Sequence, residues 1–206
     1  MKTTIKFLLL GVIAFTSFTG CSPEDDIQLP NLSKFLIYEE FMTNSTDGTD
    51  IVLEGWTNFA EVGTVKWKEG IYYSDKYAEF TSYQSGQPSN VAWLISPAID
   101  MDVYANETLA FDVAQAYVST PSNSLELMVS TNFDGTNVTA ATWTSISFTP
   151  PPLDFDTNFD FFSSGLVGLS SYTGIIHFAF KCKGSGTNSS LDGTYELDNI
   201  RLFDKK

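Results

Sequence analysis

The stretch IIHFAFKCK (residues 175–183) alternates between apolar and other residues at nearly every step. In an extended chain its residues fall on two faces: Ile176, Phe178, Phe180 and Cys182 on one, His177, Ala179 and Lys181 on the other. Such alternation predicts a β-strand that is buried on one side. We therefore expect His177, the single histidine, to face solvent, and Cys182 to be a small core residue.

The same period of two runs through most of the chain from Phe35 onward. The predicted strands cover residues 35–41, 55–59, 65–68, 77–83, 91–96, 108–118, 125–131, 142–148, 175–183 and 194–203. No convincing amphipathic helix of useful length interrupts them. Asp-Gly pairs at 47–48, 134–135 and 192–193 are typical of tight turns. Many short strands separated by such turns predict an all-β fold, either a two-sheet sandwich or a barrel.

One segment departs from this pattern. TPPP (149–152) breaks a strand, because proline has no backbone N–H to donate, and LDFDTNFDFFSSG (153–165) then mixes acids with aromatics. We expect a long surface loop here. Two interpretations of this loop are open. Surface loops of this kind often carry function. In the other interpretation, the phenylalanines only pin the loop to the core.

Length and charge limit the class of protein and its partners. A chain of 206 residues with 17 Phe, nine Tyr and four Trp suits one folded domain with a sizeable core. Removing Lys2 and Lys6 with the leader described below leaves nine basic residues against 25 acidic ones, a net charge of −16. This charge repels nucleic acid and anionic lipid head groups, so we expect neither as a partner. We expect a monomer.

The first 20 residues predict a lipoprotein signal peptide. Two lysines precede FLLLGVIAF (7–15), an apolar run of nine residues that is too short to cross a bilayer. FTGC (18–21) resembles a lipobox, where a bacterial lipoprotein is cut and its new N-terminal cysteine is acylated, although Phe18 replaces the usual leucine. Cys21 is therefore the predicted lipidation site; an ordinary secretory signal with a chance cysteine is the alternative. Acylation of Cys21 leaves only Cys182, which excludes an intramolecular disulfide.

Residues 21–34 are predicted to be a lipidated acidic tether. SPEDD (22–26) resembles the acidic tag that sends some lipoproteins of Bacteroidetes-type bacteria to the outer face of the outer membrane. A plain solvated tether is the alternative. The predicted location is the outer membrane, held through the lipid anchor alone, with the domain exposed at the cell surface.

Seven segments occur in an order that resembles one domain family. They are NVAWLISPAIDM (90–101), LAFDVAQAY (109–117), LELMVSTNFDG (125–135), ATWTSIS (141–147), SGLVGLSSYTG (164–174), IIHFAFKCKGS (175–185) and YELDNIRLF (195–203). Together they are similar to the jelly-roll domain of the choice-of-anchor and cleaved-adhesin type found in surface lipoproteins. The resemblance covers residues 35–206. It implies a two-sheet jelly-roll β-sandwich, galactose-binding or concanavalin-like in general architecture, that serves as a binding or accessory module.

Two carboxylates are predicted to face inward. Alternation in FLIYEEF (35–41) places Glu39 on the face of Phe41. Alternation in YELDNIRL (195–202) places Glu196 and Asp198 on the face of Ile200, and of these two Asp198 is the one singled out. A buried carboxylate needs a cation, hydrogen bonds or a proton. First and last strands of jelly rolls often lie side by side, and the resemblance implies a structural calcium at such acids, so Glu39 and Asp198 are the predicted metal ligands. The alternative pairs each acid, at a strand end, with Arg201, a lysine or water.

The aromatic residues divide by their expected exposure. Trp93 and Trp143 are expected to pack in the core. The sequence does not decide whether Trp56 and Trp67 lie in the core or at the surface. Tyr72, Tyr73 and Tyr83 are expected to be exposed near loops.

The sequence contains no motif that marks catalysis. A Gly-x-Ser-x-Gly elbow, a metal-binding histidine pair and a phosphate-binding glycine loop are all absent. A carboxylate pair would suffice for glycoside hydrolysis, but nothing singles out one pair among 25 acids. We therefore expect a non-catalytic binding module for a glycan or a surface protein. The alternatives are a protein-only structural or interaction subunit of an outer-membrane or adhesion assembly and, least favoured, a carbohydrate-active enzyme.

Overall fold

The computed structural model describes residues 35–41, 43 and 46–204. The predicted signal peptide (1–20), Cys21 and the rest of the predicted tether (22–34) lie outside these residues. Within the described ranges, no helix is both long enough and apolar enough to span a membrane.

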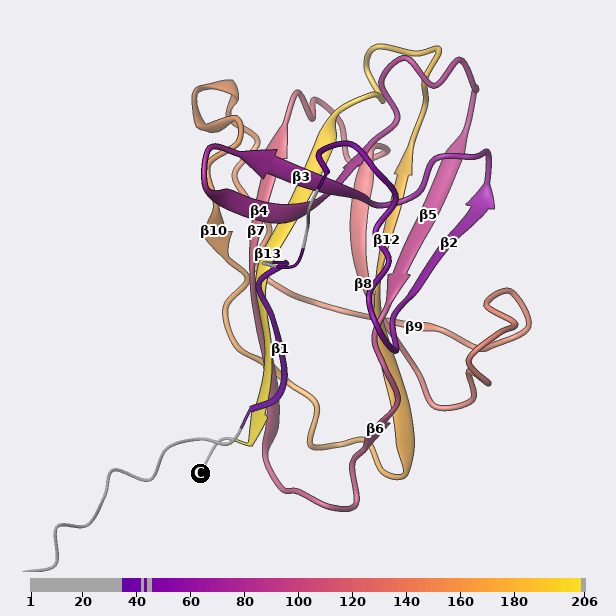
Figure 1. The fold of residues 1–206 in the computed structure, drawn as a ribbon, viewed down its shortest axis with the longest axis vertical. Helices are drawn as coiled ribbons and strands as arrows, with labels where there is room; N and C mark the ends of the chain where they lie inside the picture. The colour runs from indigo at the N-terminus through magenta and orange to yellow at the C-terminus, as the bar shows by residue number, and fades with distance from the viewer. Residues whose placement is uncertain (1–34, 42, 44–45, 205–206) are drawn as a thin grey trace, which may run out of the picture. The chain divides into compact units, whose positions relative to one another are not determined.

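The strands form two antiparallel sheets, which Figure 1 shows side by side. The seven-stranded sheet contains β1 (Phe35–Glu39), β3 (Lys68–Tyr72), β4 (Asp75–Thr81), β7 (Glu107–Ala116), β10 (Phe162–Ser163), β11 (Val167–Gly168) and β13 (Thr194–Asp204). The six-stranded sheet contains β2 (Thr57–Val62), β5 (Asn90–Ile95), β6 (Ile99–Asp100), β8 (Ser124–Ser130), β9 (Thr144–Ile146) and β12 (Ile175–Gly184). A single 3-10 turn, Phe155–Thr157, is the only helical element in the described ranges. The predicted jelly-roll β-sandwich is confirmed.

The order of strands places the long C-terminal strand near the middle of its sheet. β13 pairs with β7 on one side, with β4 along its first half and with β1 along its second half, in the order β10-β7-β13-β4-β3. The second sheet has the order β2-β5-β12-β8-β9. The first and last strands of the described domain are therefore neighbours, as expected.

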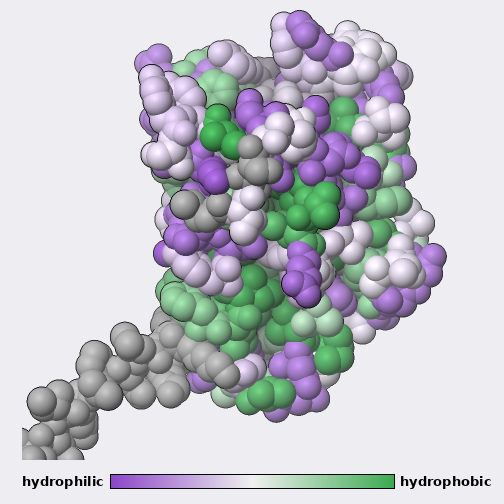
Figure 2. All heavy atoms as spheres, in the orientation of Figure 1, coloured by the Kyte–Doolittle hydropathy of each residue, from purple (hydrophilic) through white to green (hydrophobic). Residues whose placement is uncertain are grey.

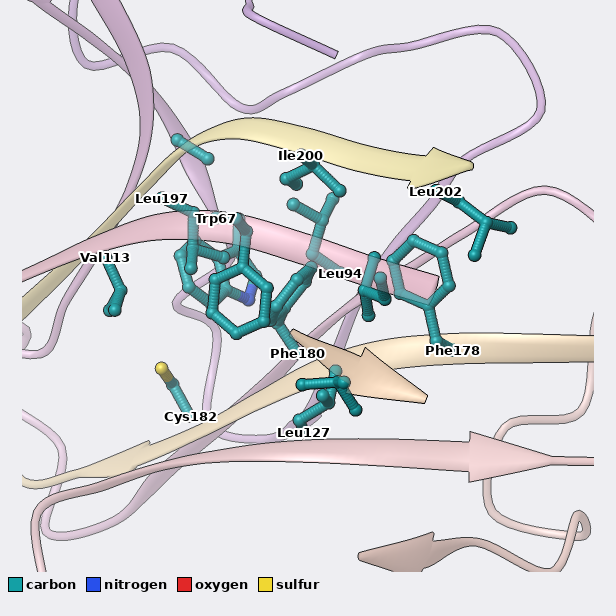
Figure 3. Close-up of a cluster of buried hydrophobic side chains, with 14 of the residues drawn as sticks. Trp67, Leu94, Val113, Leu127, Phe178, Phe180, Cys182, Leu197, Ile200 and Leu202 are labelled. Carbon is teal, nitrogen blue, oxygen red and sulfur yellow. The ribbon is translucent and has the colours of Figure 1, made fainter. Parts of the chain in front are cut away.

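The main core lies between the two sheets (Figure 3). Phe178, Phe180 and Cys182 of β12 are fully buried there, and they meet side chains such as Leu197 and Ile200 of β13. The apolar face read from residues 175–183 is thus the core face, and Cys182 is a buried free thiol as predicted. Burial of each large apolar side chain contributes roughly 1.5–3 kcal/mol to folding.

The outer face of the six-stranded sheet is also covered, and the exposure predicted for His177 is wrong. His177 is only 8% exposed, its Nδ1 lies 2.8 Å from the backbone oxygen of Ser96, and its ring meets Phe133 edge-on at 5.0 Å. Phe133 and Trp143 belong to the 131–143 segment and pack with Trp93 in a second apolar cluster. Because this segment shields the outer face, β12 is buried on both sides over much of its length.

A β-bulge in β13 reverses the alternation that was predicted for this strand. Leu197 and Ile200 are both fully buried in the core, although they are three positions apart. The pairing with β7 shifts register between Asp198 and Arg201, and Asn199 has a positive φ of 50°. The extra residue turns Asp198 to the outer face of the sheet, so its predicted inward orientation beside Ile200 is wrong.

Candidate binding groove

A groove of about 560 Å³ lies on the outer face of the seven-stranded sheet. Its lining residues are Glu79 and Thr81 of β4, Thr194 of β13, the aromatics Tyr83, Tyr117 and Phe159, and Ser189 and Asp192 of the loop between β12 and β13. Ala78 and Phe80 point into the core, so Glu79 and Thr81 alternate to the opposite face. The floor is therefore polar, and the aromatic rings come from loops around it.

Three aromatic rings remain exposed at this groove. Tyr83, Tyr117 and Phe159 are 61%, 58% and 46% exposed, although they could bury much apolar surface. Tyr117 and Phe159 meet edge-to-face, with ring centroids 5.8 Å apart. Aromatic residues left at the rim of a concave polar surface are typical of ligand sites.

Backbone contacts hold Tyr117 and Phe159 in place. Both residues have positive φ angles, 58° and 67°, in the left-handed region that bulky side chains rarely adopt. The Tyr117 N–H donates to Oδ1 of Asn158 at 3.0 Å, and the Phe159 N–H donates to the carbonyl of Gln115 at 3.1 Å. Such conformations persist only where the surroundings enforce them, and they concentrate at functional sites.

The predicted long loop forms one wall of the groove. Phe155, Phe159 and Phe161 are 59%, 46% and 40% exposed, so these phenylalanines do not pin the loop to the core. The loop is instead fixed to the outer face: the Gln115 side-chain amide donates to the carbonyl of Pro152 at 2.8 Å, and Phe161 packs 6.0 Å from Tyr77.

Two glutamates lie side by side at the end of the groove floor. Glu79 on β4 and Glu196 on β13 are register partners, and Glu196 is only 3% exposed. Burial, reinforced by the charge of Glu79, raises the pKa of Glu196 to about 8. Burial and the charge of Asp47 also raise the pKa of Glu79, while Lys68 opposes them. This part of the sheet therefore favours protonated carboxyls or a bound cation.

Glu39 and Asp198, the predicted calcium ligands, lie on opposite faces of the sheet. Glu39 is the register partner of core-facing Ile200, and its Oε1 accepts a 2.7 Å hydrogen bond from the Phe41 N–H. Asp198 faces outward, where Asn199 donates to it at 2.6 Å and 3.1 Å and where burial raises its pKa to about 6.

Calcium takes six to eight oxygen ligands. Among the residues that the structure describes, no group of three or more His, Cys, Asp or Glu side chains is placed to hold a metal. The pair Glu39 and Asp198 does not fit one shared ion in this arrangement. Calcium binding by the domain stays a prediction.

The other aromatics discussed in the sequence analysis lie either in the core or at the surface. Trp67 is fully buried and Trp56 packs against the main core, which settles their open assignment, and Tyr72 and Tyr73 are exposed as expected. Tyr117, which was predicted to lie within a strand, was not recognised as a site residue. The sequence offered one signal for this residue: Tyr117 comes directly after the point where the alternating pattern of β7 ends.

Comparison with known proteins identifies the class of fold. No protein-family model matches the chain, and no curated protein matches its sequence. A cleaved adhesin domain of Lys-gingipain from Porphyromonas gingivalis is similar over 82% of this chain and 98% of that domain, with 19% identity and a TM-score of 0.50. Another cleaved adhesin domain of Lys-gingipain covers the same shares with 16% identity and a TM-score of 0.50. A xylan-binding domain from Paenibacillus barcinonensis covers 84% of this chain and 97% of that domain, with 15% identity and a TM-score of 0.46.

At these identities the similarity shows the fold alone. The chain shares the β-sandwich of cleaved adhesin domains, which confirms that part of the resemblance predicted from the sequence.

Proposed function

We propose that this chain is a non-catalytic glycan-binding module, held at the outer-membrane surface through an acylated Cys21. The observation that supports it is the groove, with exposed Tyr83, Tyr117 and Phe159 around a floor of hydroxyl and carboxyl groups. A sugar ring presents apolar C–H faces and polar hydroxyl edges. Rings that stack on the faces, beside side chains that bond the edges, match both parts of it.

The carboxyl pair does not support hydrolysis. Glycosidases use one acid with a raised pKa to protonate the leaving oxygen, and Glu196 has such a pKa. However, Glu196 is 3% exposed and does not line the groove. On the same face of the sheet, the rings of Phe161, next to β10, and Tyr77 on β4 meet across the intervening strands β7 and β13. A general acid must reach the bond that it protonates, so we assign no catalytic role to Glu196.

The experiment is a binding screen of the mature chain carrying Cys21→Ser, which cannot be acylated, against a broad polysaccharide array with calcium present. Binding to one glycan class, competed by its soluble oligomer, is the expected result. A blank array from a protein with a cooperative thermal melt would overturn glycan binding.

A protein partner is the second candidate, and an apolar surface at the other end of the domain favours it. Figure 2 shows hydrophobic residues gathered over the lower part of the domain. Two hollows of about 440 and 300 Å³ share Phe35, which is 53% exposed, and Val103 and Leu166 at their rims are each 61% exposed. Exposed apolar patches of this kind mark protein contacts. Capture of one outer-membrane protein by wild type, but not by Phe35→Ser, would support this candidate.

A further inference from the structure

The groove has an acidic lining with no basic side chain of its own. Glu79 and Asp192 contribute carboxylates, and none of its lining residues in the described ranges is Lys, Arg or His. Lys68, opposite Glu79 on β3, is the nearby cation that acts on Glu79. A glycan with uronic acid or sulfate groups would meet like charge here, which is unfavourable.

Glu196 adds a buried carboxyl next to this lining. It lies on the same face as Thr194 of the groove floor and directly beside Glu79. Burial and the charge of Glu79 both raise the pKa of Glu196. In the described part of the chain, no hydrogen bond or cation opposes this shift. A carboxyl buried in this way is costly to ionise, and a cation bound nearby reduces that cost.

The aromatic rings complete a surface that suits a positive group. The face of an aromatic ring attracts a cation within about 6 Å, and the attraction strengthens when water is excluded. Tyr117 and Phe159 form a corner of two perpendicular rings, and the acids lie on the same groove. Thr81, Thr194 and Ser189 add hydroxyls that can pair with sugar hydroxyls and that a lysine side chain would leave unused.

We propose that the groove binds a glycan bearing free primary amines, whose ammonium groups lie between the carboxylates and the aromatic rings. This inference rests on the proposed glycan-binding function and specifies its ligand class. Neutral glycans would use the rings and hydroxyls but not the charge, and anionic glycans would be repelled.

The test compares two oligomers with the same backbone, a glucosamine hexamer and an N-acetylglucosamine hexamer. Binding of each to the mature chain with Cys21→Ser is measured by titration calorimetry at mildly acidic pH, where the glucosamine amines are protonated, in low and in high salt. We expect the glucosamine hexamer to bind about tenfold more tightly and to lose this advantage in high salt. Glu79→Gln and Asp192→Asn should each reduce the advantage. Glu54→Gln, which removes an exposed acid that does not line the groove, should keep it.

The other outcomes separate this inference from the function on which it rests. Equal binding of both hexamers, lost in Tyr117→Ala, would overturn the amine preference and leave glycan binding standing. Binding of polylysine but of neither hexamer, lost in Glu79→Gln, would overturn both and assign the groove to a basic peptide. Absence of binding by all three probes would also overturn the amine preference.

Discussion

Glu79 of β4 and Glu196 of β13 lie directly opposite each other on the outer face of the sheet, with no cation between them in the described structure. Like charges in facing positions of neighbouring strands destabilise a sheet. Lys68 faces Glu79 from its other side, so the uncompensated group is Glu196. Ionisation of Glu196 beside Glu79 therefore lowers the free energy of unfolding, and the unfavourable interaction lies next to the groove and not in the core.

This cost predicts a stability that falls with rising pH. Below its ordinary pKa of 4.5 the Glu196 carboxyl is protonated in both the folded and the unfolded chain, so its ionisation does not affect the free energy of unfolding there. Between pH 4.5 and about 8 the unfolded chain releases a proton that the folded chain retains, so the free energy of unfolding declines. We expect Glu196→Gln to raise this free energy by about 2–4 kcal/mol at pH 8 and by little at pH 4.5.

Thermal or denaturant unfolding of both proteins across this pH range measures the effect. Asp198, whose pKa is raised to about 6, adds a smaller decline between pH 3.8 and 6 that Glu196→Gln leaves in place. Parallel pH curves for wild type and Glu196→Gln would contradict the role of this carboxyl.

The exposed rings of the groove predict a loss of ligand affinity without a loss of fold. We expect Tyr117→Ala and Phe159→Ala each to weaken glycan binding about tenfold, because each removes a stacking surface worth about 1–1.5 kcal/mol. Tyr73→Ala is the matched control, since Tyr73 is 90% exposed and does not line the groove. Titration with the best ligand from the array measures all three. A similar loss in Tyr73→Ala would place binding elsewhere.

The architecture followed from the sequence because alternation is a local property. Long strands such as β7 and β12 were predicted within one or two residues of their ends, since a run of about ten residues gives several periods of alternation. The short strands β6, β10 and β11 were missed, because two paired residues leave no period to detect. β3 was placed too early in the chain, at 65–68 instead of Lys68–Tyr72.

The site could be predicted less well than the fold, for two physical reasons. The bulge at Asn199 turns Asp198 to the other face of the sheet. Strict alternation of side chains along the strand cannot predict such a bulge. His177 was assigned to solvent because its strand pattern cannot reveal that Phe133, 44 positions earlier, covers it. The groove likewise combines residues from β4, β13 and four loops, and only the fold brings them together.

A close backbone contact predicts a destabilising glycine substitution at the edge of the groove sheet. A Cβ at Gly70 would lie 2.1 Å from a ring carbon of Tyr77, so Gly70→Ala must displace the ring from its contact with Phe161. We expect a loss of about 1–3 kcal/mol in the free energy of unfolding. Gly168→Ala is the control, because a Cβ there meets no atom within 4 Å and the backbone has an ordinary φ. Equal denaturation midpoints for the two variants would show that Tyr77 moves aside without cost.

The predicted anchor is tested by fractionation of cells. Cys21 lies outside the described residues, so the prediction rests on the sequence: two lysines, the apolar run 7–15 and the lipobox-like FTGC (18–21). Multiple acyl chains hold a protein on a membrane because each buried CH₂ contributes about 0.8 kcal/mol. We expect Cys21→Ala to move the protein from the membrane fraction to the soluble fraction, whereas Cys182→Ala should leave it on the membrane. Retention of Cys21→Ala on membranes would contradict the anchor.

The predicted structural calcium is tested by melting the domain in calcium chloride and in EDTA. An ion bound by Glu39 and Asp198 predicts that EDTA lowers the Tm of wild type and changes that of Asp198→Ala very little, since a bound ion stabilises only the folded state. The β13 bulge places these carboxylates on opposite faces, so one shared ion would require the strand to lose its bulge. If the Tm of wild type is the same in calcium chloride and in EDTA, the prediction of a structural calcium is wrong. A drop of equal size in both proteins would assign the ion to other ligands.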